Sequence, residues 1–254
     1  MINWIPSFVR QRVYASRWWN RHRKNRAELE YWAENLEKMV RWYDRREGWR
    51  GFDYPEGELR ETRFDRRKNA AMSYVNIETK KATYLSDLRL RADAFTQLRV
   101  GDIGSGPFPT LLVFDECERV HIDHLMMDYR RIGYPLDDFE ARDCQFVSAK
   151  SERLPFPDGW FDVLISRNAL DHVDDFRATA AEMIRVLAPS GHVHMLINYH
   201  RPTQTEPQAI GDLDVQQAFD GVPLRKVYEL DAAWGFPDGK SVLWTSLPDS
   251  TVLA

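Results

Sequence analysis

The chain has 254 residues, of which 29% are charged, and its formal net charge is −4 at pH 7. The length is sufficient for one α/β domain and an extension, and the charge argues against nucleic acid as the partner. No apolar run approaches the roughly 20 residues that span a bilayer, and the N-terminus lacks the uninterrupted apolar core of a signal peptide. The two cysteines, Cys117 and Cys144, form no disulfide framework. These observations predict a cytoplasmic protein.

The first 26 residues differ in composition from the rest of the chain. Arginine and lysine alternate there with tryptophan, tyrosine and phenylalanine, without one acidic residue. Such a composition is typical of a segment that contacts an anionic membrane surface, which would place residues 1–24 at the inner face of the membrane. The alternative is a helical arm that packs on its own domain or on the second subunit of a homodimer. Both interpretations stay open.

A helix is predicted to follow this arm. Asn25 and Glu28 have the spacing of a capping box, and apolar residues then recur at helical spacing from Leu29 to Tyr43. Nothing in this helix indicates a catalytic role. Residues 47–68 are rich in glycine, proline and charge, which predicts a loop, and a further helix is expected over about residues 78–95.

From Leu98 onward, β-rich and helical segments alternate. Such alternation is typical of a mostly parallel sheet with helices on both faces. The last two β-rich segments lie close enough in the chain to pair antiparallel. We therefore predict a mostly parallel, doubly wound α/β sheet of seven strands over residues 76–254, preceded by an N-terminal helical extension over residues 1–75. The predicted strands are Leu98–Ile103, Arg119–Ile122, Gln145–Ser148, Asp162–Ser166, His192–Asn198, Arg225–Leu230 and Ser241–Leu247, and the predicted helices are Pro109–Cys117, Leu125–Ile132 and Phe176–Leu187.

The first of these strands runs directly into a glycine turn that contains Asp102, Gly104 and Gly106. Glycine has no Cβ, so a ligand can approach the backbone closely, and the amides of the turn and of a helix that follows favour an electron-rich group. A nicotinamide-binding turn would carry a third glycine where Pro109 stands, which argues against an oxidoreductase. The Asp102-x-Gly104-x-Gly106 pattern instead resembles the first motif of the class I S-adenosylmethionine-dependent methyltransferases.

This resemblance covers about residues 96–200 and implies S-adenosylmethionine as the cofactor. Asp123 ends the second predicted strand, 21 residues after Asp102. An acid at about that distance accepts hydrogen bonds from both hydroxyls of a ribose. Phe108 stands where the family often has a glycine, so its side chain must point away from the ligand.

The segment Ser151–Val163, with Leu-Pro-Phe followed by Phe-Asp-Val, closely resembles the part of the family that lies beside the adenine. Many members have an aspartate where Lys150 stands, and a lysine cannot accept a hydrogen bond. The adenine contact is therefore expected from Ser151, Glu152 or the backbone. The full set of expected cofactor-binding residues is Asp102, Gly104, Ser105, Gly106, Asp123, Ser151, Glu152 and Arg167.

Candidates for the acceptor side follow the fourth and fifth predicted strands, because open α/β sheets bind ligands outside the carboxyl ends of their strands. By the resemblance, Ser166–Val173 passes under the cofactor and ends beside the acceptor. His172 in this segment is suited to removing a proton near neutral pH, so we expect it to act as general base. His200 is a second catalytic candidate, better placed to bind the acceptor, and Tyr199 and Glu206 are expected substrate-binding residues.

No metal site is predicted. Asp171, His172, Asp174 and Asp175 are clustered in the chain, but no second group at convincing spacing completes a ligand set.

These expectations describe a methyltransferase that works by in-line displacement, with general-base help and no covalent enzyme intermediate. We expect the acceptor to be a saccharide, a glycan or a similar hydroxylated small molecule, because the acceptor edge is polar and carries histidine and tyrosine. The alternative is a non-catalytic binding or regulatory subunit of the same fold. Phe108 and Lys150 favour that alternative, because both depart from the family pattern.

Overall fold

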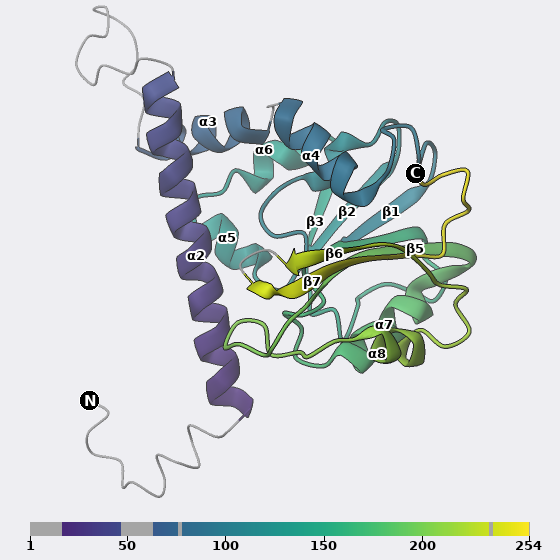
Figure 1. The fold of residues 1–254 in the computed structure, drawn as a ribbon. Helices are drawn as coiled ribbons and strands as arrows, with labels where there is room; N and C mark the ends of the chain where they lie inside the picture. Colours follow the sequence, from purple (N-terminus) through teal and green to yellow (C-terminus); the bar gives the residue numbers. More distant parts are fainter. Residues whose placement is uncertain (1–16, 47–62, 76–77, 234–235, 254) are drawn as a thin grey trace, which may run out of the picture.

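The computed structural model describes residues 17–46, 63–75, 78–233 and 236–253. Its centre is a single sheet (Figure 1), in which β1 to β5 run parallel to one another and β7 runs antiparallel to β5 and β6. The predicted doubly wound architecture with an antiparallel closing pair is therefore confirmed. The strands are β1 (Arg99–Ile103), β2 (Glu118–Asp123), β3 (Cys144–Ser148), β4 (Phe161–Arg167), β5 (Leu187–Tyr199), β6 (Arg225–Ala233) and β7 (Phe236–Thr245), in the order β3-β2-β1-β4-β5-β7-β6.

Helices cover both faces of this sheet and one of its ends. A helix of 30 residues precedes the sheet, and shorter helices connect the strands. In the part of the chain that is described, the helical elements are α2 (Arg17–Arg46), α3 (Arg63–Val75), α4 (Glu78–Leu88), the 3₁₀ turn η1 (Thr110–Val113), α5 (Met126–Ile132), α6 (Leu136–Glu140), α7 (Phe176–Val186) and α8 (Asp212–Ala218).

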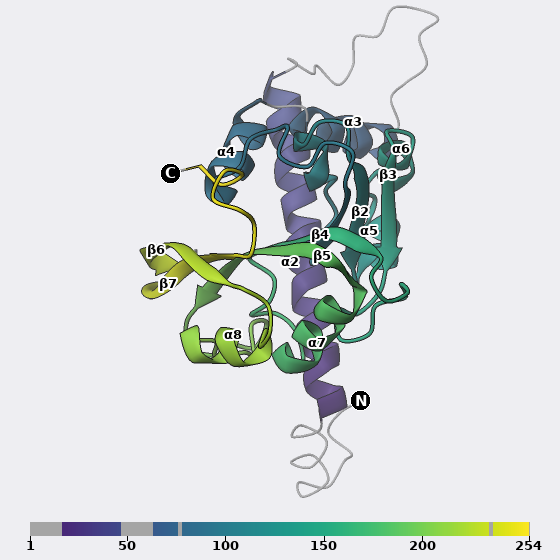
Figure 2. The ribbon, with the colours of Figure 1, turned by 90° about the vertical axis from the view of Figure 1, so that its right-hand side faces the viewer.

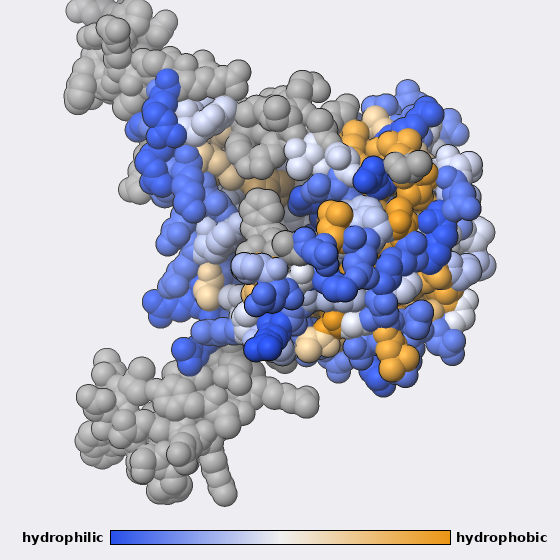
Figure 3. All heavy atoms as spheres, in the orientation of Figure 1, coloured by the Kyte–Doolittle hydropathy of each residue, from blue (hydrophilic) through white to orange (hydrophobic). Residues whose placement is uncertain are grey.

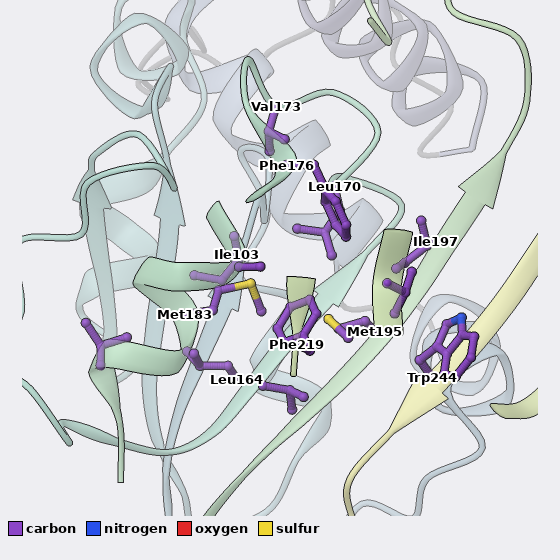
Figure 4. Close-up of a cluster of buried hydrophobic side chains, with 14 of the residues drawn as sticks. Ile103, Leu164, Leu170, Val173, Phe176, Met183, Met195, Ile197, Phe219 and Trp244 are labelled. Atoms are coloured by element: carbon purple, nitrogen blue, oxygen red, sulfur yellow. The ribbon is translucent and has the colours of Figure 1, made fainter. Parts of the chain in front are cut away.

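The core has two layers, one on each face of the sheet. Each central strand contributes to both layers, because its successive side chains point to opposite faces. On β4, Leu164 belongs to one layer, and Val163 and Ile165 belong to the other. The Leu164 layer is covered by α7 and by the chain around α8, and Figure 4 shows Met183 and Phe219 among the strand residues there. Residues of α4 and η1 cover the opposite layer. The sheet is thus buried on both faces, as a parallel sheet requires.

The long helix α2 lies at one end of the sheet rather than in either covering layer (Figures 1 and 2). Its Trp32 ring packs over the turn that follows β1, where a Cβ on Gly106 would lie 2.9 Å from the indole. Asn25 Oδ1 lies 3.2 Å from the ring of His124, which follows β2. The side of α2 at the left edge of Figure 3 is mostly hydrophilic. The helix therefore presents a polar side outward and crosses the carboxyl ends of the central strands.

Two predictions about the N-terminal region are wrong. The helix does not begin at Asn25, because α2 already begins at Arg17, and the Asn25 side chain bonds His124 rather than capping the helix. Residues 63–68, predicted as loop, belong to α3, where Arg66 pairs with Asp44 of α2. Residues 1–16 and 47–62, which carry most of the basic arm and most of the predicted loop, lie outside the described residues.

The helix predicted over Pro109–Cys117 is also wrong, because only η1 forms there. Pro109 has a ψ of 62°, which is outside the helical range. The glycine turn therefore continues into a 3₁₀ turn rather than into an α-helix. The helix expected to reach Phe95 ends in α4 at Leu88, directly before Arg89, whose φ of 52° ends the helix. The short helices α6 and α8 were not predicted. Among the described helices, none combines the length and the apolar composition needed to cross a bilayer.

Candidate functional site

The strand order reverses between β1 and β4, since β1 leads outward to β2 and β4 leads outward to β5. Such a switch point opens a crevice at the carboxyl ends of the two strands. A cavity of about 1340 Å³ lies there, and its walls include the turn after β1, the segment after β4 and the inner side of α2. This volume exceeds the usual range for one small ligand, so the cavity has room for a cofactor and an acceptor together.

The glycine turn after β1 forms the floor of this cavity. Gly104 and Gly106 have φ values of +73° and +63°, a left-handed conformation that glycine adopts without strain. A Cβ on Gly104 would lie 2.3 Å from the Cβ of Ala169. Ser105 is buried between them and its hydroxyl donates to the Gly106 carbonyl. The glycines are therefore required by the chain itself, in addition to any close approach of a ligand.

Asp123 lies at the end of β2 with its carboxylate against the glycine turn. Its Oδ2 accepts a hydrogen bond from the Gly106 amide at 3.1 Å, and its Oδ1 accepts one from the Leu125 amide at 2.8 Å. Burial raises the pKa of Asp123. Each carboxylate oxygen can accept a further hydrogen bond, and the side chain lines the cavity. The group therefore fits the ribose diol expected from the sequence.

Asp102 also lines the cavity, but the protein already uses its carboxylate. The Tyr84 hydroxyl donates to Asp102 Oδ2 at 3.2 Å, and the Thr110 hydroxyl donates to the same oxygen. Burial raises the pKa of Asp102 to about 6. Arg167, another expected cofactor-binding residue, lines the cavity while its Nε donates to Asp87 Oδ2 at 3.1 Å.

The loop after β3 supplies the remaining expected cofactor contacts. Ser151 and Glu152 both line the cavity. Glu152 Oε1 accepts hydrogen bonds from the amides of Asp174 and Asp175, at 2.7 and 3.1 Å, which ties this loop to the segment after β4. Lys150 forms an ion pair with Asp174. Its charge is therefore used within the protein.

Phe108, which departs from the family pattern, packs edge-on against Trp32 and Tyr134, at centroid distances of 5.8 and 5.6 Å. Its ring also lines part of the cavity wall beside α2. The aromatic side chain at this position therefore joins the turn to α2.

Three residues from two distant segments of the chain meet at the side of the cavity where the acceptor is expected. One potential ligand atom each from Asp171, His172 and Glu206 lies within 4.8 Å of the other two. His172 Nδ1 lies 3.2 Å from Glu28 Oε1, and His172 Nε2 lies 3.6 Å from Glu206 Oε1. Burial disfavours the charged ring, but the hydrogen bond to Glu28 and the nearby carboxylates outweigh this effect and raise the pKa of His172. The sequence had identified His172 and Glu206 separately, and the structure brings them together.

His200 and Tyr199 lie elsewhere, contrary to their expected roles. Neither is among the residues that line the cavity. His200 Nε2 lies 3.0 Å from Asp171 Oδ2, and its Nδ1 lies 2.8 Å from the Arg201 carbonyl oxygen, so both ring nitrogens are engaged. The Tyr199 hydroxyl accepts a hydrogen bond from the Trp244 indole at 2.9 Å. The geometry therefore gives His200 the task of holding Asp171 and gives Tyr199 a place in the core.

The sequence missed the contribution of α2, in which it shows no sign of a catalytic role. Glu28 bonds His172, and Lys24 donates to the carbonyl oxygen of His172. Trp32 covers the glycine turn. No local sequence pattern could have predicted these contacts, because each contact joins residues that are far apart in the chain. The described residues of α2 that line the cavity are Lys24, Ala27, Glu28, Tyr31, Trp32, Asn35 and Met39.

Comparison with known proteins agrees with this geometry. Residues 98–195 match the methyltransferase domain family. The ubiquinone/menaquinone biosynthesis C-methyltransferase UbiE of Coxiella burnetii is 34% identical over 116 residues, which are 44% of this chain and 44% of that protein. The uncharacterized methyltransferase YcgJ of Bacillus subtilis is 31% identical over 115 residues, again 44% of each chain. The matches thus span less than half of the length of these curated relatives.

The crystal structure of YcgJ shares the fold, with a TM-score of 0.52 and 17% identity, over 66% of this chain and 97% of that chain. The matched residues 98–195 contain the glycine turn, Asp123 and the loop with Ser151 and Glu152. These are the parts of the cavity that are expected from the sequence to contact the ribose, the adenine and the methionine portion of the cofactor. Residues 98–195 thus match a methyltransferase domain, and the fold around them is that of the class I S-adenosylmethionine-dependent methyltransferases.

Proposed function

We propose that the protein transfers a methyl group to a hydroxyl oxygen of a saccharide or a similar hydroxylated small molecule. The observation that carries this proposal is the composition of one cavity, whose walls include both Asp123 beside the glycine turn and the pair His172 and Glu206. A donor site and an acid–base cluster that share one cavity can bring an acceptor oxygen in line with the methyl group.

The cofactor would be held by residues already described. Asp123 would accept from the ribose hydroxyls, and the loop with Ser151 and Glu152 would lie beside the adenine. The glycine turn and Asp102 would contact the methionine portion. When bound, the cofactor supplies a sulfonium methyl group that is already activated for displacement. The protein therefore needs to supply only proximity, orientation and proton removal.

The cluster on the acceptor side would remove the proton of the acceptor hydroxyl. An alcohol keeps its proton near neutral pH, so attack is aided when that proton is removed as the new bond forms. The acceptor oxygen forms a bond to the methyl carbon, the carbon–sulfur bond breaks with its electron pair on sulfur, and the hydroxyl proton leaves toward the cluster. His172 is the imidazole of the cluster that lines the cavity.

The relatives leave the acceptor atom open. UbiE is named as a C-methyltransferase, but the family match ends at residue 195. Glu206, Thr205 and Ser241, which line the acceptor side of the cavity, lie beyond it. Their polar groups suit an acceptor that carries several hydroxyls better than a quinone ring with an apolar tail. This polarity supports oxygen as the acceptor atom.

Methyl transfer from ¹³C-methyl-labelled S-adenosylmethionine tests the proposal. The purified protein is offered simple saccharides, nucleotide-linked saccharides and a phenolic quinol, and the products are analysed by NMR. We expect a methoxy carbon signal on a saccharide. A product with the label on carbon, or transfer to the quinol alone, would contradict the proposal.

The matched variant is His172→Ala. We expect it to lower kcat by roughly 10²–10⁴-fold, the usual range for loss of proton transfer. Calorimetry with S-adenosylhomocysteine should show little change in affinity for this variant. Unchanged turnover would remove His172 from the reaction.

A further inference from the structure

Each residue of the Asp171, His172 and Glu206 cluster is held by a second group that leaves one donor atom uncommitted. His200 engages Asp171 Oδ2 at 3.0 Å, and Glu28 engages His172 Nδ1 at 3.2 Å. The Thr203 hydroxyl donates to Glu206 Oε2 at 2.7 Å. An outer partner on every ligand is the usual arrangement of metal sites, in which a carboxylate fixes the ring orientation of a ligating histidine.

Asp171 provides an independent observation that points to a ligand at this cluster. Its side chain is fully buried, and among the described residues its Oδ1 has no hydrogen-bond partner. A buried carboxylate oxygen without a partner is costly. Its neighbour His172 and the spatially adjacent Glu206 each offer an atom within 4.8 Å of this carboxylate. A cation between the three residues would remove the cost.

The separation of the His172 and Glu206 ligand atoms is close to the value that a small divalent cation requires. Ligand atoms that each lie about 2.1 Å from one cation are about 3.0–3.4 Å apart at octahedral or tetrahedral angles. His172 Nε2 and Glu206 Oε1 are 3.6 Å apart, so small rotations would bring them to that separation. One imidazole and two carboxylates form a mixed set, which favours first-row metals over magnesium or calcium.

We propose that Asp171, His172 and Glu206 bind a divalent first-row metal ion of the Mn²⁺ class. His172 and Glu206 line the cavity, so the remaining coordination positions open toward the acceptor. Two neighbouring oxygens of an acceptor would occupy them, which selects a vicinal diol or a hydroxy acid. The role in catalysis rests on the proposed methyl transfer. With the metal bound, His172 would act as a ligand through Nε2 in place of its role as proton acceptor, and a hydroxyl bound to the metal would release its proton to water as its oxygen takes the methyl group.

Binding of Mn²⁺ is measured first, by electron paramagnetic resonance, on the full chain after treatment with a chelator and without cofactor or acceptor. We expect one equivalent of Mn²⁺ per chain. Glu206→Gln removes one ligand on a half-buried side chain and should abolish this binding. Glu28→Gln removes the outer partner of His172 and should weaken it by about 10–100-fold.

Glu34→Gln is the control, because Glu34 is exposed on the same helix, and it should bind Mn²⁺ as the wild type does. Unfolding curves establish that the variants are folded. The proposal would be overturned if the wild type binds no Mn²⁺, or if Glu206→Gln binds Mn²⁺ as tightly as the wild type. Two further measurements, S-adenosylhomocysteine binding and methyl transfer in the presence of a chelator, distinguish failure of the metal site from failure of the proposed methyl transfer. Full turnover without metal would overturn the metal site and leave the methyltransferase proposal standing. Mn²⁺ binding without any methyl transfer would overturn the methyltransferase proposal and leave the metal site standing.

Discussion

Glu28 Oε1 lies 3.2 Å from His172 Nδ1, although the two residues are 144 positions apart in the chain. Glu28 Oε2 also lies 3.6 Å from the ring of His124, which directly follows Asp123. One carboxylate of α2 therefore contacts both the segment that follows β2 and the segment that follows β4. This helix lies outside the residues 98–195 that match the methyltransferase domain family, so Glu28 reaches the cavity from outside the matched domain.

Glu28→Gln should lower kcat by about 10–100-fold, the range for loss of an outer carboxylate that orients a functional histidine. The glutamine keeps the size of the side chain but removes the charge that faces the ring. Affinity for S-adenosylhomocysteine should change little. Steady-state kinetics and calorimetry check this expectation, with Glu34→Gln as the control on the exposed side of α2. Equal kcat values for both variants would show that Glu28 only anchors the helix.

Asp123→Ala should weaken binding of S-adenosylmethionine by about 1.5–3 kcal/mol, the range for a hydrogen bond to a charged group. The reason is that the Asp123 carboxylate is the expected acceptor for the ribose hydroxyls. Calorimetry at one pH measures the change. Asp115→Ala is the control, because Asp115 is exposed and does not line the cavity. If the folded Asp123→Ala protein binds as tightly as the wild type, Asp123 does not hold the ribose.

The strands and the cofactor motifs could be predicted from the sequence, because their signals are local. Val163, Leu164 and Ile165 form a continuous apolar run, which is typical of a strand buried on both faces. Gly104 and Gly106 mark a turn at which positive φ is required. Signals of this kind need only a few consecutive residues, so the sheet and its ligand-binding edge followed from them.

The position of α2 and the composition of the acceptor cluster could not be predicted. Glu28 has the spacing of a capping box, and this local interpretation concealed its contact with His172. Glu206 lies in a loop whose path is set by long-range contacts, such as that from the Gln208 amide to the Asp171 carbonyl. His200 follows β5 where acceptor residues are expected, yet its ring stacks on Phe236 and bonds Asp171. Sequence position fixes the edge of the sheet but not the direction of a side chain.

Asp102→Asn should change the pH dependence of stability. Burial raises the pKa of Asp102 from 3.8 to about 6, so between these values the folded protein binds more protons than the unfolded chain. The contribution of Asp102 to the free energy of unfolding therefore falls as the pH rises through this window, by about 3 kcal/mol at most. Asparagine carries no charge, so the free energy of unfolding of the variant does not fall for this reason as the pH rises. Urea unfolding without cofactor should show the variant gaining stability relative to the wild type from pH 5 to pH 8. A difference that does not vary with pH would mean that Asp102 is charged throughout.

Gly104→Ala separates two reasons for glycine in the turn after β1. The φ of +73° at this position costs an alanine about 1–2 kcal/mol, and the new Cβ would lie 2.3 Å from the Cβ of Ala169. The single variant should therefore lose stability and cofactor binding together, which alone does not identify the cause.

The second substitution, Ala169→Gly, removes the atom that the new Cβ meets and leaves the φ of residue 104 unchanged. The double variant should recover the part of the stability that the clash removed, as measured by urea unfolding. Its affinity for S-adenosylhomocysteine then distinguishes the two reasons. Affinity that stays low in the stable double variant means that the ligand itself needs the space above Gly104. Affinity that returns with stability means that Gly104 is required only by its packing against the segment after β4, and the turn would then bind the cofactor through its backbone shape alone.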